Sequence, residues 1–185
     1  MMTRIILSLI LFLAAGCTSL QTASDLNSQA DFSSLKTFAW LEDGGQSAND
    51  VRLHNPLVQE TVRTAVEQAL VAKGYEKAEG SQADFVVVWF GAIEKKLKQD
   101  KLDQFYAPYG YAALYRDPVL NPGPPRTILE YEEGTLIIDI LEPQDRKLLW
   151  RGSGIGRLAE EQPEQTALKN LARAVTKILE PFPSR

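Results

Sequence analysis

One stretch of the chain decides its fold: DFVVVWF, residues 84–90. Apolar side chains fill both alternating faces of this stretch. Such a pattern is typical of a central strand that is buried by helices on one side and at least partly covered on the other. The strand could run on through residues 91–93. We therefore interpret the rest of the chain as the elements that flank and cover this strand.

A first strand and a helix precede it. Residues 32–41 alternate, with Phe38 and Trp40 on one face. Asn55-Pro56 is a typical helix start, because a capping side chain is followed by proline at the first helical position. Apolar residues then recur on one helical face, and Gly74 supplies a left-handed stop.

A hairpin and a second helix follow it. Residues 135–141 alternate as a strand, residues 142–146 form a turn, and residues 147–158 return as the partner strand. An amphipathic helix begins after Pro163 and ends before Pro181. Both elements lie on the carboxyl-terminal side of the central strand, beyond a long loop.

The order strand–helix–strand–loop–strand–strand–helix predicts an α+β fold. We expect a two-layer sandwich in which two helices cover one face of a mostly antiparallel sheet of about four strands. The helix between the first two strands also allows a parallel relation between them. Residues 31–183 should form a single domain, because 185 residues with 44% hydrophobic content suffice for one core.

Residues 1–16 are typical of an export signal. A short basic start precedes an apolar run over residues 5–15, which is too short to span a bilayer. Small residues then lead to Cys17, and this ending resembles the lipobox of bacterial lipoproteins, although Ala14 stands where that motif most often has Leu. The resemblance implies cleavage before Cys17 and acyl chains such as palmitate on it. With Thr18 next, it also implies transport to the outer membrane, in the inner leaflet facing the periplasm.

Residues 17–30 are interpreted as a flexible tether, because Ser, Thr, Asn, Gln and Asp dominate them. A weak strand near Leu20 is the alternative within this range. For the cysteine, the alternative is an ordinary signal peptide in which Cys17 occurs by chance.

Composition excludes several classes of function. The net charge is −4, and removal of residues 1–16 with their single charged residue, Arg4, makes it −5, which disfavours nucleic acid as a partner. The chain has one cysteine, within the export signal, and one histidine, His54. We therefore expect no disulfide, no metal site and no cofactor.

An aromatic loop over residues 104–127 is the candidate partner-binding segment. Tyrosines lie among prolines there without helical or strand periodicity, and long loops in compact domains are often functional. Tyrosine offers rigid contact area and a polar tip. The expected partner-binding residues are Tyr106, Tyr109, Tyr111 and Tyr115. Alternatively, these rings cover the open face of the sheet, where Trp40 or Trp89 would also lie.

Three features invite a chemical interpretation, and a structural one is stronger for each. Residues 154–159 fit the G-x-G-x-x-A pattern of dinucleotide-binding turns, but the close approach of a helix, or a bulge, explains alternating glycines in a strand better. His54 is expected at a loop–helix boundary without a catalytic neighbour. Asp139, with Glu94 or Glu132, could serve acid–base chemistry, but Arg151 on the neighbouring strand is placed to pair with it.

Lysines follow the central strand, at positions 95, 96, 98 and 101. They could contact anionic lipid headgroups or lipopolysaccharide. Interleaved acidic residues dilute their charge, so a solvated surface is the stronger interpretation.

Several separated segments together resemble one family. They are DFSSLKTFAW (31–40), KGY (73–75), ADFVV (83–87), YEEGTLIID (131–139) and LLWRG (148–152). In this order they resemble the bacterial lipoproteins of domain-of-unknown-function family 4136, over residues 31–183. The resemblance implies a lipid-anchored α/β domain that faces the periplasm. It implies no activity and no functional residue.

The hypothesis from the sequence is therefore a lipid-anchored, non-enzymatic binding or scaffolding module whose partner is an envelope protein or glycan. An envelope hydrolase or small-ligand carrier, with its site between the sheet and the aromatic loop, is the alternative. A purely structural domain without a partner is the third possibility.

Overall fold

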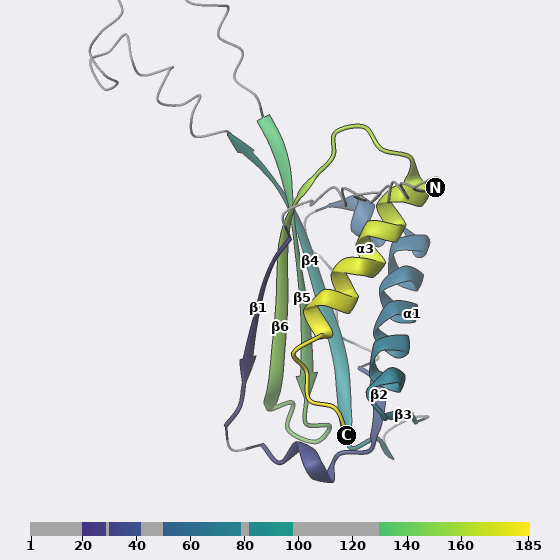
Figure 1. Cartoon of the computed structure of the whole chain (residues 1–185), viewed down its shortest axis with the longest axis vertical. Helices are drawn as coiled ribbons and strands as arrows, with labels where there is room; N and C mark the ends of the chain where they lie inside the picture. Colours follow the sequence, from purple (N-terminus) through teal and green to yellow (C-terminus); the bar gives the residue numbers. More distant parts are fainter. Residues whose placement is uncertain (1–19, 29, 42–49, 79–81, 98–129) are drawn as a thin grey trace, which may run out of the picture.

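The computed structural model describes residues 20–28, 30–41, 50–78, 82–97 and 130–185. Helices α1 (Pro56–Ala72) and α3 (Glu164–Leu179) pack side by side on one face of a sheet (Figure 1). In this part of the chain, no helix has both the length and the apolar content that crossing a membrane requires. The expected α+β class and the two helices on one face are confirmed.

The sheet has six strands in the order β1-β6-β5-β4-β2-β3. Their bounds are β1 Gln21–Leu26, β2 Thr37–Trp40, β3 Glu76–Lys77, β4 Phe85–Leu97, β5 Glu130–Leu141 and β6 Leu148–Leu158. Strand β2 runs parallel to both β3 and β4, and the other neighbours are antiparallel. The parallel relation that the helical crossover allowed is therefore present.

Six strands, rather than about four, correct the sequence-based fold. Strand β1 lies inside residues 17–30, so six residues of the expected tether belong to the sheet. Strand β3 is a two-residue addition after α1. Both are edge strands whose pairing comes from a neighbouring strand, and neither carries a strand-like apolar alternation of its own. The first predicted strand is shorter than expected, because Phe32–Ser34 form the 3₁₀ helix η1.

Local signals do define the ends of α1 as expected. The Asn55 side chain accepts a hydrogen bond from the Leu57 backbone N–H at 2.9 Å, and Pro56 begins the helix. Gly74 adopts a φ of +93°, the left-handed conformation that glycine reaches without strain. These caps satisfy backbone groups that the helix itself leaves unpaired.

Asp84 fixes the start of the central strand to β2. Its carboxylate accepts hydrogen bonds from the backbone N–H groups of Lys36 and Thr37, at 2.8 and 2.9 Å, and from the Thr37 hydroxyl. These hydrogen bonds lower the pKa of Asp84. These contacts fix the parallel register of β2 and β4 at the start of the central strand.

The main core lies between the helices and the sheet. Alternate residues of the central strands face α1 and α3, and α3 contributes fully buried Val175, Ile178 and Leu179. The sheet residues of this cluster are Phe38, Phe85, Val87, Trp89, Leu136, Ile138, Ile140, Leu149 and Trp150, with Trp40 packed at its edge. Trp40 and Trp89 thus lie on the helix-covered face, so the expectation that either would lie on the open face is wrong.

The opposite face of the sheet is called the open face here. Val86 and Val88 of β4 point to it, because successive strand residues alternate between faces. They belong to a second, smaller cluster of buried side chains with Ala39, Ala83 and Leu141. The sequence predicted that the central strand would be covered on both faces, at least partly on the second, and this cluster covers part of the second face.

Candidate functional site

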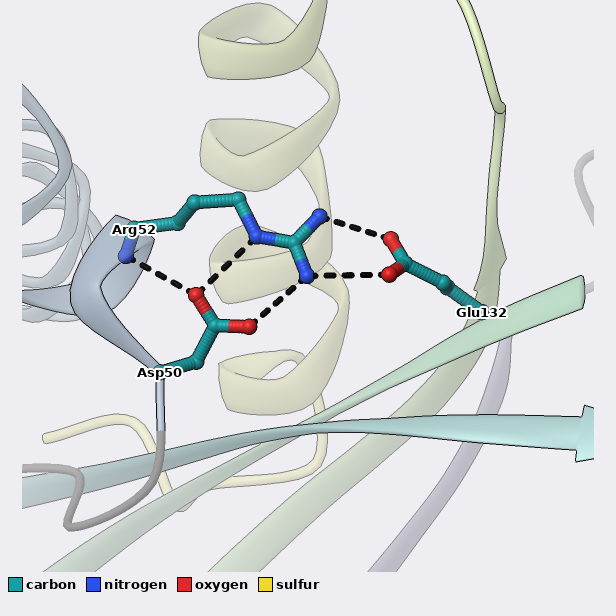
Figure 2. A network of polar contacts seen from close by, with 3 residues as sticks. All are labelled: Asp50, Arg52 and Glu132. Atoms are coloured by element: carbon teal, nitrogen blue, oxygen red, sulfur yellow. Dashed lines mark hydrogen bonds and ion pairs between the residues drawn. The ribbon is translucent and has the colours of Figure 1, made fainter.

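Arg52 connects the 3₁₀ helix η2 (Val51–His54) to β5 (Figure 2). Its Nη1 and Nη2 donate hydrogen bonds to the Glu132 carboxylate at 2.6 and 3.1 Å. Its Nε and Nη2 donate to the Asp50 carboxylate at 3.0 and 2.7 Å, and its backbone N–H donates there too. The planar guanidinium can bind two carboxylates at once, each through two hydrogen bonds. As a result, the segment before α1 is held to the sheet.

These contacts set the charge of both carboxylates. Hydrogen bonding by Arg52 lowers the pKa of Asp50 to about 2, and it also lowers the pKa of Glu132. The two carboxylates in turn raise the pKa of Arg52. All three groups therefore carry their charges at neutral pH, and neither carboxylate is placed to donate a proton.

Asp139 and Arg151 form an ion pair on the open face. Arg151 Nε and Nη2 donate to the two Asp139 oxygens at 2.7 and 2.6 Å. Asp139 is only 3% exposed, whereas about half of the Arg151 side chain is accessible. The pKa of Arg151 is raised by this hydrogen bonding and, more weakly, by Asp25 of β1. The pairing expected from the sequence is confirmed.

The carboxylates offered as catalytic partners of Asp139 do not meet it. Glu132 is an odd number of residues away on the same strand, so its side chain points to the helix-covered face. Glu94 shares the open face but is paired with Lys96, and it lies six residues along β4 from Val88, the residue opposite Asp139. The structure therefore brings no two of these three carboxylates together.

His54 and the glycine pattern at residues 154–159 have structural roles rather than chemical ones. His54 is exposed at the end of η2, directly before the α1 cap. Gly154, Gly156 and Ala159 belong to β6 and its end, and α3 begins only at Glu164, so no helix starts in the glycine turn. Within the described residues, no group of three or more His, Cys, Asp and Glu side chains could hold a metal ion.

The alternating glycines of β6 instead make room for neighbours. A Cβ at Gly154 would lie 2.8 Å from Ile178 Cδ1 of α3 and 3.3 Å from Leu20 Cδ1. A Cβ at Gly156 would lie 3.4 Å from the same Leu20 atom. The expected close approach of a helix is present at Gly154. The packing of Leu20 is a second reason for glycine that the sequence did not reveal.

The open face exposes an apolar patch. Phe90 of β4 and Ile155 of β6 are 39% and 40% exposed, and half-buried Ile137 of β5 lies between these strands. The ladder places Phe90 directly opposite Ile137. Large exposed apolar side chains on a rigid sheet are typical of interaction surfaces.

Several predicted residues lie outside the described part of the chain. They are Cys17, Tyr106, Tyr109, Tyr111, Tyr115, Lys98 and Lys101. The lysines that can be placed belong to β4, where Lys95 is opposite Glu132 and Lys96 binds Glu94. The Arg52 network is the main feature that sequence reasoning missed. Its one sequence signal was Asp50 two residues before Arg52, in the polar loop that precedes the predicted helix.

Comparison with known proteins identifies the family. The model of a domain of unknown function, DUF4136, matches residues 22–184. The chain belongs to the DUF4136 family. The resemblance noted in the sequence is thereby confirmed. No curated protein matches this DUF4136 chain.

Several solved structures are similar to this chain at low identity. A DUF4136 family protein from Bacteroides thetaiotaomicron is 14% identical with a TM-score of 0.46, over 88% of this chain and 94% of that one. A PelC dodecamer from Paraburkholderia phytofirmans is 10% identical with a TM-score of 0.48, over 90% and 99%. A minor lipoprotein from Acinetobacter baumannii is 11% identical with a TM-score of 0.36, over 82% and 98%.

Proposed function

We propose that this DUF4136 chain is a lipid-anchored, non-enzymatic binding or scaffolding module of the bacterial envelope. It is held at the inner leaflet of the outer membrane and faces the periplasm. The proposal that the module is not an enzyme rests on one observation: its candidate catalytic carboxylates are paired with arginines. Arg151 pairs with Asp139 on the open face, and Arg52 pairs with Glu132 on the other. A carboxylate whose two oxygens both accept hydrogen bonds from a guanidinium is not free to protonate a substrate.

The anchor in this proposal is Cys17. The sequence before it supports cleavage and acylation, and two or more acyl chains make membrane attachment effectively stable. Mass spectrometry of the protein isolated from its native host tests this. We expect a chain that lacks residues 1–16 and carries acyl chains on Cys17. A retained leader or an unmodified thiol would refute the anchor.

The partner-binding part of the proposal uses Tyr106, Tyr109, Tyr111 and Tyr115. The segment that carries them leaves β4 at Leu97 and returns to β5 at Glu130, and these two residues pair in the ladder. Both connections therefore start at the same end of the sheet, on its two longest strands. A rigid base of this kind suits a segment that presents tyrosines to an envelope protein or glycan.

In-cell crosslinking tests this part. A photoreactive residue at Tyr109 should capture a defined envelope component, and the same residue at exposed Glu180 should not. Replacement of the other three tyrosines by alanine should weaken the capture without changing the free energy of unfolding. Unchanged capture in that triple variant would refute recognition by the tyrosines.

A further inference from the structure

The chain is fixed to the fold almost immediately after Cys17. Leu20 packs over Gly154 and Gly156, and β1 begins at the next residue, Gln21. Three residues of fully extended chain span at most about 11 Å. The proposed lipid on Cys17 is therefore separated from the sheet by only a few residues of chain.

This short connection selects one end of the domain. Gln21 pairs with Ile155, Ile155 pairs with Thr135, and Thr135 pairs with Ala92. We call this end, with residues 92–97, 130–135 and 155–158, the anchor end. In Figure 1 it is the end at which β1 starts and from which β4 and β5 project.

The start of α1 belongs to the anchor end as well. Arg52 binds Glu132, and a Cβ at Gly91 would lie 3.2 Å from the Leu53 side chain, so η2 is packed on this part of the sheet. From there α1 runs through 17 residues, which is about 25 Å of helix. The opposite end of α1, with Val71, therefore lies far from the anchor end.

Exposed apolar side chains occur at this end beside the anchor. Val51 of η2 is 82% exposed, the highest exposure of any large apolar residue in the described chain, and Leu57 in the first turn of α1 is 50% exposed. In water such exposure brings no benefit, whereas burial of these CH₂ and CH₃ groups in a lipid interface is favourable.

Charge indicates the kind of lipid. Among the described residues at this end, the basic residues Arg52, Lys95, Lys96 and Arg157 are outnumbered by the acidic residues Asp50, Glu94, Glu130, Glu132 and Glu133. A surface with this balance is not attracted to anionic headgroups. A zwitterionic lipid such as phosphatidylethanolamine is the compatible partner.

We propose that the domain sits on the membrane with its anchor end down, so that Val51 and Leu57 contact a zwitterionic lipid interface. This inference rests on the proposed lipidation of Cys17. It makes the origin of the tyrosine-bearing segment membrane-proximal, and it directs the turn between β5 and β6 and the carboxyl terminus toward the periplasm.

Two matched variants of the full chain test the orientation. Val51→Cys and Val71→Cys replace the same residue type at exposed positions on opposite ends of α1. Cys17 is the only native cysteine, so after its acylation the new thiol is the only one free for labelling. Each purified lipidated variant is labelled with a fluorophore and reconstituted into phosphatidylethanolamine–phosphatidylcholine vesicles that contain nitroxide-labelled lipid.

We expect lipid-borne nitroxide to quench the label at position 51 severalfold more strongly than the label at position 71, and aqueous iodide to show the reverse order. Equal quenching, or stronger lipid quenching at position 71, would overturn the orientation and leave the lipid anchor intact. Mass spectrometry of the same samples separates the two proposals, because an unmodified Cys17 would overturn both.

Discussion

Gly152 of β6 tests how closely α3 approaches the sheet. A Cβ at this position would overlap the Trp150 ring and lie 2.7 Å from Ile178 Cγ2. Trp150 is 1% exposed and Ile178 is fully buried, so neither side chain can move into solvent. Gly156, on the same face of the same strand, is the matched control, because its Cβ would meet only Leu20 Cδ1 at 3.4 Å and Leu20 Cα at 4.0 Å.

The two substitutions by alanine should change the free energy of unfolding in opposite directions. Overpacking a tight core costs about 1–3 kcal/mol, and the clash at Gly152 involves two immovable neighbours, so Gly152→Ala should lower the free energy of unfolding by about 2 kcal/mol. At Gly156 the added methyl group makes an ordinary contact. The reduced entropy of the unfolded chain should then make Gly156→Ala about 0.5 kcal/mol more stable than the native protein.

Urea denaturation followed by circular dichroism measures both effects. The midpoint for Gly152→Ala should fall, with an unchanged slope, and its melting temperature should drop by about 4–8 °C. Gly154→Ala should lie between the two, because its Cβ would meet only Ile178 below 3.0 Å, at 2.8 and 2.9 Å, and no tryptophan ring. A Gly152→Ala variant as stable as Gly156→Ala would refute the close packing of α3 on β6.

Three further changes test the polar contacts. Arg151→Met should cost about 3 kcal/mol in urea unfolding, because it leaves a buried charge on Asp139, whereas Asp139→Asn should cost less, because half-exposed Arg151 can reach water. The pKa of Asp50 is lowered to about 2, so this carboxylate should stabilise the fold above pH 5. The gain should be only about 1 kcal/mol, because its partner Arg52 is half exposed to water. It should disappear as the pH falls from 4 to 2. In Asp50→Asn, unfolding measured over the same range should lose this pH dependence, and a parallel curve would contradict the assignment. Asn55→Ala should lower thermal stability by about 1 kcal/mol and Asn55→Asp should not, since only the latter keeps the oxygen that caps α1.

Some contacts of the candidate site join residues close in sequence, and others join residues far apart. Asp139 and Arg151 lie on the two strands of one hairpin, 12 residues apart, so strand alternation and a short turn were enough to predict their pairing. Arg52 and Glu132 are 80 residues apart, and no short-range pattern connects them. The position of Glu132 on the helix-covered face, away from Asp139, likewise depended on where β5 begins.

The sequence alone determined the central strand, both helices, their ends and the family. Each of these follows from preferences that a few neighbouring residues express, such as the side-chain cap at Asn55 or the left-handed backbone at Gly74. The sequence offered a weak strand near Leu20 only as an alternative to the tether, and tertiary structure decided that β1 joins the sheet and that Leu20 packs on β6. A polar strand like β1 gains its hydrogen bonds from the free edge of a strand more than 120 residues later, and that edge exists only once the rest of the domain has folded.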